Sequence, residues 1–134
     1  LIGRRMPTFC SAGGRAVLAF LPSEQVQEII ARSDLKPLTN QTITDPDQIY
    51  AKVDEARDKG YAIIFGECMV GEVSLAAPVM GSSGLPIGAV HIVGSLSEWD
   101  PEEFEQRFAP LAIETARSLS RKSASTRPIF AARG

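Results

Sequence analysis

The sequence predicts an α+β fold in which helices are grouped before and after a small antiparallel sheet. Two observations predict it. Apolar residues repeat at helical spacing in four segments, and between residues 61 and 93 the pattern changes to short apolar runs separated by glycine turns. Grouped helices of this kind are typical of the α+β class, in which the helices are segregated from the antiparallel sheet.

Two helices are expected in the first third of the chain. Residues 11–21, SAGGRAVLAFL, are almost all apolar and open with a serine and a glycine pair. This pattern suits a buried helix whose first turn closely approaches another backbone. The next helix begins at Pro22 and ends before Pro37. Because their connection is short, the two are expected to form a pair.

Two later helices carry complete start signals. Each has an aspartate cap, a proline in the first helical position and a glutamine or glutamate three residues after the cap. The signals predict helices over about 46–59 and from Pro101 to Leu119. After Leu119 the residues are mostly basic, small or polar. We therefore expect residues 123–134 to form a loose tail after a domain that spans residues 1–122.

Three strands are expected at 61–69, 72–80 and 85–93, with turns at Gly71 and at the GSSG sequence of residues 81–84. Three strands make a thin sheet. The chain also begins without methionine, in an apolar stretch, as a piece of a longer protein would. We therefore expect the strands that complete the sheet to lie upstream or to come from a partner chain.

Composition narrows the class of protein. A length of 134 residues suits a single soluble domain. Lys and Arg number 14 against 16 Asp and Glu, a balance that disfavours direct binding to nucleic acid. Two widely separated cysteines and no secretory signal favour a cytoplasmic location. The longest apolar stretch, 85–93, is too short to cross a membrane, so no membrane association is expected.

His91 is the only histidine. Strand alternation puts Val93 on its face and Val90 and Ile92 on the other. A lone histidine in a strand is more often structural than catalytic, because acid–base work usually needs an orienting partner.

A hydrolase that used His91 would need Ser74 or a cysteine, Cys10 or Cys68, as its nucleophile. None of these residues lies in a recognisable nucleophile motif. One histidine and two isolated cysteines also lack the spacing of a metal site, so neither a metal nor a cofactor is expected. A small hydrolase using Ser74 or Cys10 with His91 stays as an alternative hypothesis.

The segment Ala12-Gly13-Gly14 has two interpretations. Unobstructed N–H groups at the start of a helix bind carboxylates or phosphates. Glycines there also permit tight packing without any ligand. The sequence alone leaves both open. Glu67 and Glu72 flank the predicted turn and are interpreted as solvated hairpin charges.

Seven short segments in order resemble the effector-binding domain of IclR-type bacterial transcriptional regulators. The resemblance covers residues 2 to about 120, and the combination in register is more specific than any segment alone. The segments are IGRRMP (2–7), SAGGRAVLAFLP (11–22), TI (42–43), ARDKGYA (56–62), GE (66–67), GEVSLAAPV (71–79) and GAVHIVG (88–94).

The resemblance implies a GAF-like, or profilin-like, fold with a curved antiparallel sheet, helices packed on one side and a small-molecule pocket on the other. It also implies an upstream winged helix-turn-helix domain that binds operator DNA. The first strands of the effector domain are then missing from this chain. From the resemblance we expect the protein to form homodimers or homotetramers. We expect it to have no enzymatic activity. A GAF-like sensor of another signalling protein is the second alternative.

The resemblance also implies a set of effector-binding residues. Family members hold small organic acids by backbone amides, here those of Ala12 and Gly13. Matching side chains fall on Ile64, Ser74, His91 and Val93, with Met6 as an apolar wall. Glyoxylate-type members carry an aspartate, a cysteine and two serines at the four strand positions, so this pocket is more apolar. We therefore expect a larger carboxylate, aromatic or branched, with His91 and Ser74 as polar anchors.

Overall fold

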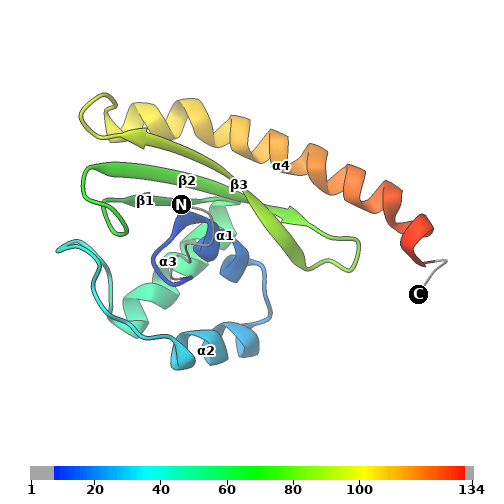
Figure 1. Ribbon diagram of the computed structural model, residues 1–134, viewed down its shortest axis with the longest axis horizontal. Helices are drawn as coiled ribbons and strands as arrows, with labels where there is room; N and C mark the ends of the chain where they lie inside the picture. The colour runs from blue at the N-terminus through cyan, green and yellow to red at the C-terminus, as the bar shows by residue number, and fades with distance from the viewer. Residues whose placement is uncertain (1–7, 132–134) are drawn as a thin grey trace.

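The computed structural model describes residues 8–131 and confirms the α+β class. Four helices and a three-stranded antiparallel sheet follow the predicted order (Figure 1). None of the helices in this part of the chain has both the length and the apolar character that a membrane span needs. The elements are α1 (Ala12–Ala19), α2 (Ser23–Arg32), α3 (Pro46–Lys59), β1 (Ala62–Phe65), β2 (Glu72–Met80), β3 (Pro86–Ser95) and α4 (Pro101–Ala131).

The predicted capping residues begin the helices. Ser11 accepts a hydrogen bond from the Gly14 N–H at 3.0 Å and caps α1. Asp45 caps α3, and Gly60 ends that helix in the left-handed conformation with φ 87°. Helix α4 extends past the predicted end at Leu119 and remains helical to Ala131. The part of the expected tail that the structure describes, residues 123–131, therefore continues α4 as helix.

The sheet has the order β1-β2-β3, with β2 in the centre. Strand β1 is shorter than expected and ends at Phe65, because Gly66 turns the chain with φ 70°. The Gly66 N–H donates to the Glu72 carbonyl oxygen at 2.8 Å and closes a loop over residues 66–71. This loop replaces the last third of the predicted first strand and carries its side chains toward α1.

Helices cover both faces of the sheet, so the expectation of helices on one side is wrong. One core cluster joins β2 to α4 and includes Val73, Leu75 and Phe104. The other cluster lies on the opposite face and joins α1, α2 and α3 to Ile64 and Ala76. Figure 1 shows α4 along one side of the sheet and the other three helices on the other side. The reason is visible in β2, whose near-continuous apolar sequence is buried on both faces.

A buried ion pair links α1 to the 66–71 loop. The Arg15 side chain is 1% exposed, and its guanidinium donates two hydrogen bonds, of 2.8 and 2.6 Å, to the Glu67 carboxylate. Arg15 Nε also donates to the Phe9 carbonyl oxygen at 2.8 Å, and the Ile43 N–H donates to Glu67 at 3.1 Å. The interpretation of Glu67 as a solvated hairpin charge is therefore wrong. Its charge is neutralised and hydrogen-bonded inside the protein.

Replacement of Arg15 by alanine is expected to lower the free energy of unfolding by about 3–5 kcal/mol, because it leaves the buried Glu67 carboxylate without a partner. Urea denaturation followed by circular dichroism measures this loss. Arg32→Ala is the matched control, since the Arg32–Glu28 pair is exposed on α2; it should change stability by less than about 0.5 kcal/mol. Equal effects of the two substitutions would contradict the structural role of the buried pair.

Candidate ligand-binding site

A cavity of about 240 Å³ lies between the first turn of α1, the 66–71 loop and the exposed ends of the three strands. Six of the seven predicted site residues line it together, and the seventh, Met6, lies outside the described residues. The structure therefore brings positions from four elements to one place. The six residues are Ala12, Gly13, Ile64, Ser74, His91 and Val93.

The first turn of α1 supplies backbone donors to this cavity. The first N–H groups of a helix have no acceptor within the helix. The Ser11 hydroxyl satisfies one of them by accepting from Gly14, and the Ser11 carbonyl oxygen accepts the first regular helical hydrogen bond, from the Arg15 N–H. Within residues 8–131, no acceptor lies within hydrogen-bonding distance of the Ala12 or Gly13 N–H. These two donors lie at the positive end of the helix dipole and are suited to an anion.

His91 lies directly against this helix start. A Cβ atom added to Gly13 would lie 2.6 Å from His91 Nε2 and 2.9 Å from Cε1. The imidazole therefore occupies space that any side chain at residue 13 would need. A Cβ at Gly14 would meet the Thr8 backbone in the same way. The predicted close approach of the helix to another backbone is confirmed, and the glycine pair serves both packing and access to the donors.

The floor of the cavity is a row of side chains across the sheet. Ile64 pairs with Ser74, and Ser74 pairs with Val93, in the two antiparallel ladders. His91 pairs with Ala76 in the neighbouring row, on the same face, as alternation predicted. Directly opposed side chains lie within about 5.5 Å of each other, so this row presents one polar group between two apolar ones.

Two carboxylates line the same cavity, and each has a partner. Arg15 neutralises Glu67 as described. Glu72 accepts a hydrogen bond from the Ser74 hydroxyl at 3.0 Å. Because Ser74 donates to Glu72, the lone pairs of its oxygen remain available to a ligand donor. The sequence held a signal for Glu72, since it precedes Ser74 by two residues and strand alternation puts both side chains on one face.

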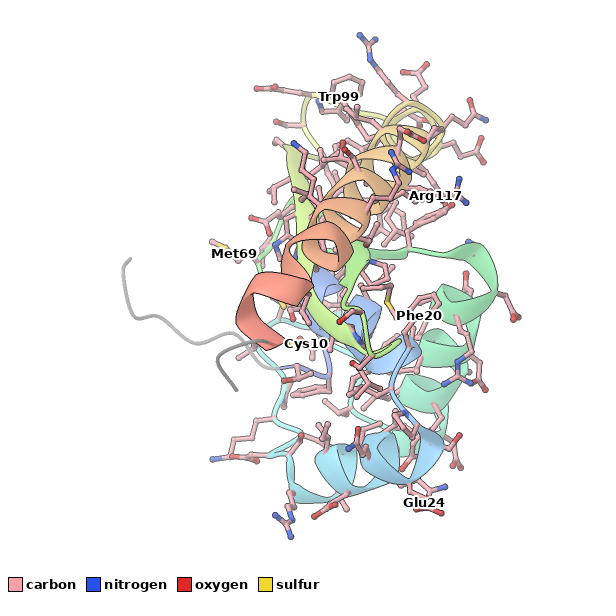
Figure 2. All side chains as sticks on the ribbon, turned by 90° about the vertical axis from the view of Figure 1, so that its right-hand side faces the viewer. Cys10, Phe20, Glu24, Met69, Trp99 and Arg117 are labelled. Atoms are coloured by element: carbon pink, nitrogen blue, oxygen red, sulfur yellow. The ribbon has the colours of Figure 1, made fainter. Side chains whose placement is uncertain are left out.

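Two cysteines meet beside the cavity. Cys68 lines it, Cys10 is completely buried, and their sulfur atoms lie 3.3 Å apart. The Cys10 thiol, hydrogen-bonded to Cys68, lowers the pKa of Cys68, and the nearby Arg15 charge acts in the same direction. The same contact, together with burial, raises the pKa of Cys10. Figure 2 shows Cys10 in the interior of the molecule and Met69, which follows Cys68, near its edge.

A larger concavity of about 470 Å³ lies beside α3 and β1. It contains two lysines, but both are already paired. Lys59 contacts Glu55 at 3.0 Å and Glu105 at 3.4 Å, and Lys52 contacts Glu55 at 3.4 Å. An anionic ligand would have to compete with these carboxylates. The cavity at the start of α1 is therefore the stronger candidate for binding an acid.

An α+β domain whose helix start and sheet line a small cavity has the architecture of a small-molecule-binding domain. The family profile described as "Bacterial transcriptional regulator IclR C-terminal" matches residues 1–121. The chain belongs to the IclR family, and the resemblance drawn from its short segments is confirmed.

Relatives of known identity agree with this assignment. The Pca regulon regulatory protein of Pseudomonas putida is 30% identical over 118 residues, which are 88% of this chain and 40% of that protein. The crystal structure of the Thermotoga maritima IclR protein has a TM-score of 0.82 at 29% identity, over 87% of this chain and 47% of that one. The chain thus spans less than half the length of these relatives.

One structural relative contains a bound ligand. It is the inducer-binding domain of a double mutant of the PobR transcription factor from Acinetobacter, in complex with 3-hydroxybenzoic acid. Its TM-score is 0.81 at 29% identity, and the match covers 90% of this chain and 69% of that one.

Substitution of Gly13 by alanine is expected to push the His91 ring away from the start of α1, because the new methyl group would overlap the imidazole. His91 is the only histidine, so its ring signals in a ¹H–¹³C NMR spectrum report the change without ambiguity. Gly88→Ala is the control on the same strand, since a Cβ there meets nothing within 4 Å. Unchanged His91 signals in Gly13→Ala would show that the ring does not pack on this glycine in solution.

Proposed function

We propose that this chain is the effector-sensing domain of an IclR-type regulator and that its cavity binds the carboxylate of a small organic acid. The observation that carries the proposal is that Ala12 and Gly13, whose N–H groups donate no hydrogen bond within residues 8–131, line a cavity that His91 also lines. We assign this effector-binding domain to residues 1–122. Met6, outside the described residues, is proposed to add an apolar wall.

The cavity favours an acid with a flat or branched apolar body. Ile64 and Val93 flank the floor, and neither offers a hydrogen bond. At the end away from α1, Glu72 and the Ser74 oxygen can both accept a hydrogen bond from a ligand. A hydroxylated aromatic acid matches both ends, with its carboxylate at the helix start and its hydroxyl at Ser74. The 3-hydroxybenzoic acid bound by the PobR relative supports this ligand class.

The binding event would act on DNA through a domain outside this chain. An effector changes operator occupancy only if it binds one arrangement of the regulator more tightly than another, and a coupling of about 1–3 kcal/mol is sufficient. We propose that the chain works in the cytoplasm as part of a homodimer or homotetramer. Its DNA contact would come from an upstream winged helix-turn-helix, since this chain carries a net charge of −2.

The outer edge of β3 fits a sheet that lacks further strands. Within residues 8–131, β3 pairs only with β2, and Val93 is 56% exposed although it lines the cavity. In the longer regulator proposed here, strands upstream of residue 1 would pair with this edge and cover Val93. We propose that such strands complete the cavity on the β3 side.

A hydrolase is the weaker hypothesis. The Ser74 hydroxyl donates to Glu72, and no hydrogen bond joins it to His91 in the described residues. Cys10 is fully buried and contacts Cys68. Neither nucleophile therefore has His91 as its base. The relatives are transcriptional regulators, which supports a binding function rather than an enzymatic one.

Isothermal titration calorimetry of the chain with 3-hydroxybenzoate and benzoate tests the proposed site. His91→Ala is expected to weaken binding of both acids about 10- to 100-fold, because a hydrogen bond to a charged group contributes roughly 1.5–3 kcal/mol. Ser74→Ala is expected to weaken only the hydroxylated acid, by about 2- to 10-fold, since it removes a neutral hydrogen bond.

Ser83→Ala serves as the control, because Ser83 lies in the exposed turn between β2 and β3, away from the cavity. It should leave both affinities unchanged. Equal losses for all three variants, or no loss for His91→Ala, would reject the assignment of these side chains. Hydrolysis of p-nitrophenyl acetate that disappears in His91→Ala would favour the hydrolase.

A further inference from the structure

The contact between Cys10 and Cys68 has a geometry suited to disulfide formation. The two sulfur atoms lie 3.3 Å apart, although the residues are separated by 58 positions in the sequence. Both cysteines are free thiols in this structure. A disulfide bond is about 2.05 Å long, so the sulfur atoms need to approach by only about 1.3 Å to form one.

The two thiols differ in access and in acidity. Cys68 lines the cavity and is half-buried, so a small reagent in the cavity reaches its sulfur. Cys10 is completely buried behind it. The contact with the Cys10 thiol lowers the pKa of Cys68, helped by the Arg15 charge and opposed by burial and by the charges of Glu67 and Glu72. The Cys68 thiol also donates to the Cys10 carbonyl oxygen at 3.0 Å. A more acidic and more accessible thiol beside a second thiol is the arrangement of peroxide-sensitive cysteine pairs.

We propose that Cys68 and Cys10 form a redox-sensitive pair, in which Cys68 reacts with a hydroperoxide and Cys10 then closes an intramolecular disulfide. The Cys68 thiolate attacks the terminal oxygen of the hydroperoxide. This forms Cys68–SOH, the O–O bond breaks, and the leaving alkoxide (hydroxide from hydrogen peroxide) takes up the proton that the Cys68 thiol had lost, giving an alcohol or water. The Cys10 sulfur then attacks the Cys68 sulfur, and the leaving hydroxide takes the Cys10 proton as water. Two thiols lose two electrons, and the hydroperoxide gains them.

The disulfide would restrain two parts of the cavity wall. Cys10 directly precedes Ser11, the cap of α1, and Cys68 lies in the loop over residues 66–71. Both Ser11 and Met69 line the cavity. The covalent bond would draw the two sulfur atoms about 1.3 Å closer than the reduced contact does, so both segments of the wall would shift with them. We therefore expect oxidation of the cysteine pair to change the affinity of the cavity for an acid, and this consequence rests on the proposed function. The formation of the disulfide does not depend on the proposed function.

The first experiment needs no ligand. The reduced full chain is treated with hydrogen peroxide, alkylated and digested without reductant for mass spectrometry. We expect one cross-linked peptide pair, Cys10 with Cys68, formed at a rate independent of protein concentration. The same chain in urea gives the reactivity of unstructured thiols, and the folded chain should react about 10-fold faster. Cross-links only between molecules, or a folded chain slower than the unfolded one, would overturn the proposal.

Single substitutions assign the two roles. Cys10→Ser is expected to keep the fast reaction but to stop at the sulfenic acid, which dimedone traps on Cys68. Cys68→Ser is expected to lose the fast reaction, because the remaining thiol is buried. Cys10→Ala is a second variant with the same expected result, should the serine variant not fold. A Cys68→Ser variant that reacts as fast as the wild type would overturn the assigned order.

A final measurement separates this inference from the proposed function. Calorimetry with 3-hydroxybenzoate compares the reduced chain with the chain carrying the disulfide. A change in affinity of at least about 5-fold supports a redox-controlled cavity. Equal affinities of the two states would overturn the effect of the disulfide on the cavity. If the disulfide forms but the chain binds no acid in either redox state, the result counts against the proposed function alone.

Discussion

The buried ion pair between Arg15 and Glu67 is the interaction on which the cavity depends. Arg15 belongs to α1, and Glu67 belongs to the loop that leaves β1, so the pair fixes the helix relative to the sheet. A buried charge is costly unless its partner and its hydrogen bonds are both in place. Here Phe9 and Ile43 provide those further hydrogen bonds through their backbones. Four separate segments are thus held in one arrangement around the helix start.

The glycine pair makes this arrangement sterically possible. The ion pair pulls the first turn of α1 toward the sheet, and a side chain at residue 13 or 14 would then overlap His91 or the Thr8 backbone. Tight packing and anion binding were separate interpretations of these glycines from the sequence alone. The geometry joins them, because the close approach that needs glycine also brings the Ala12 and Gly13 N–H groups to the cavity.

Local patterns predicted the helix starts, the strand order and the shared face of His91 and Val93 because neighbouring residues determine those features. Glu67 shows where such patterns fail. Beside a glycine turn it had every local property of a solvated charge, and only a partner 52 positions away makes its burial favourable. Arg15 was the available signal, since an arginine within an apolar helix rarely becomes buried without an acid. The helices on the second face of the sheet follow from a similar long-range effect, because the apolar run in β2 indicates burial on both faces but does not say which helix covers each one.

The same ion pair also explains why two distant cysteines meet. Arg15 holds the Phe9 carbonyl with Nε and the Glu67 carboxylate with its two terminal nitrogens. Each of these partners is followed directly by a cysteine, Cys10 after Phe9 and Cys68 after Glu67. Fixing residues 9 and 67 on one guanidinium therefore limits how far the two sulfur atoms can separate. The cysteine contact and the cavity therefore share Arg15 as a common structural support.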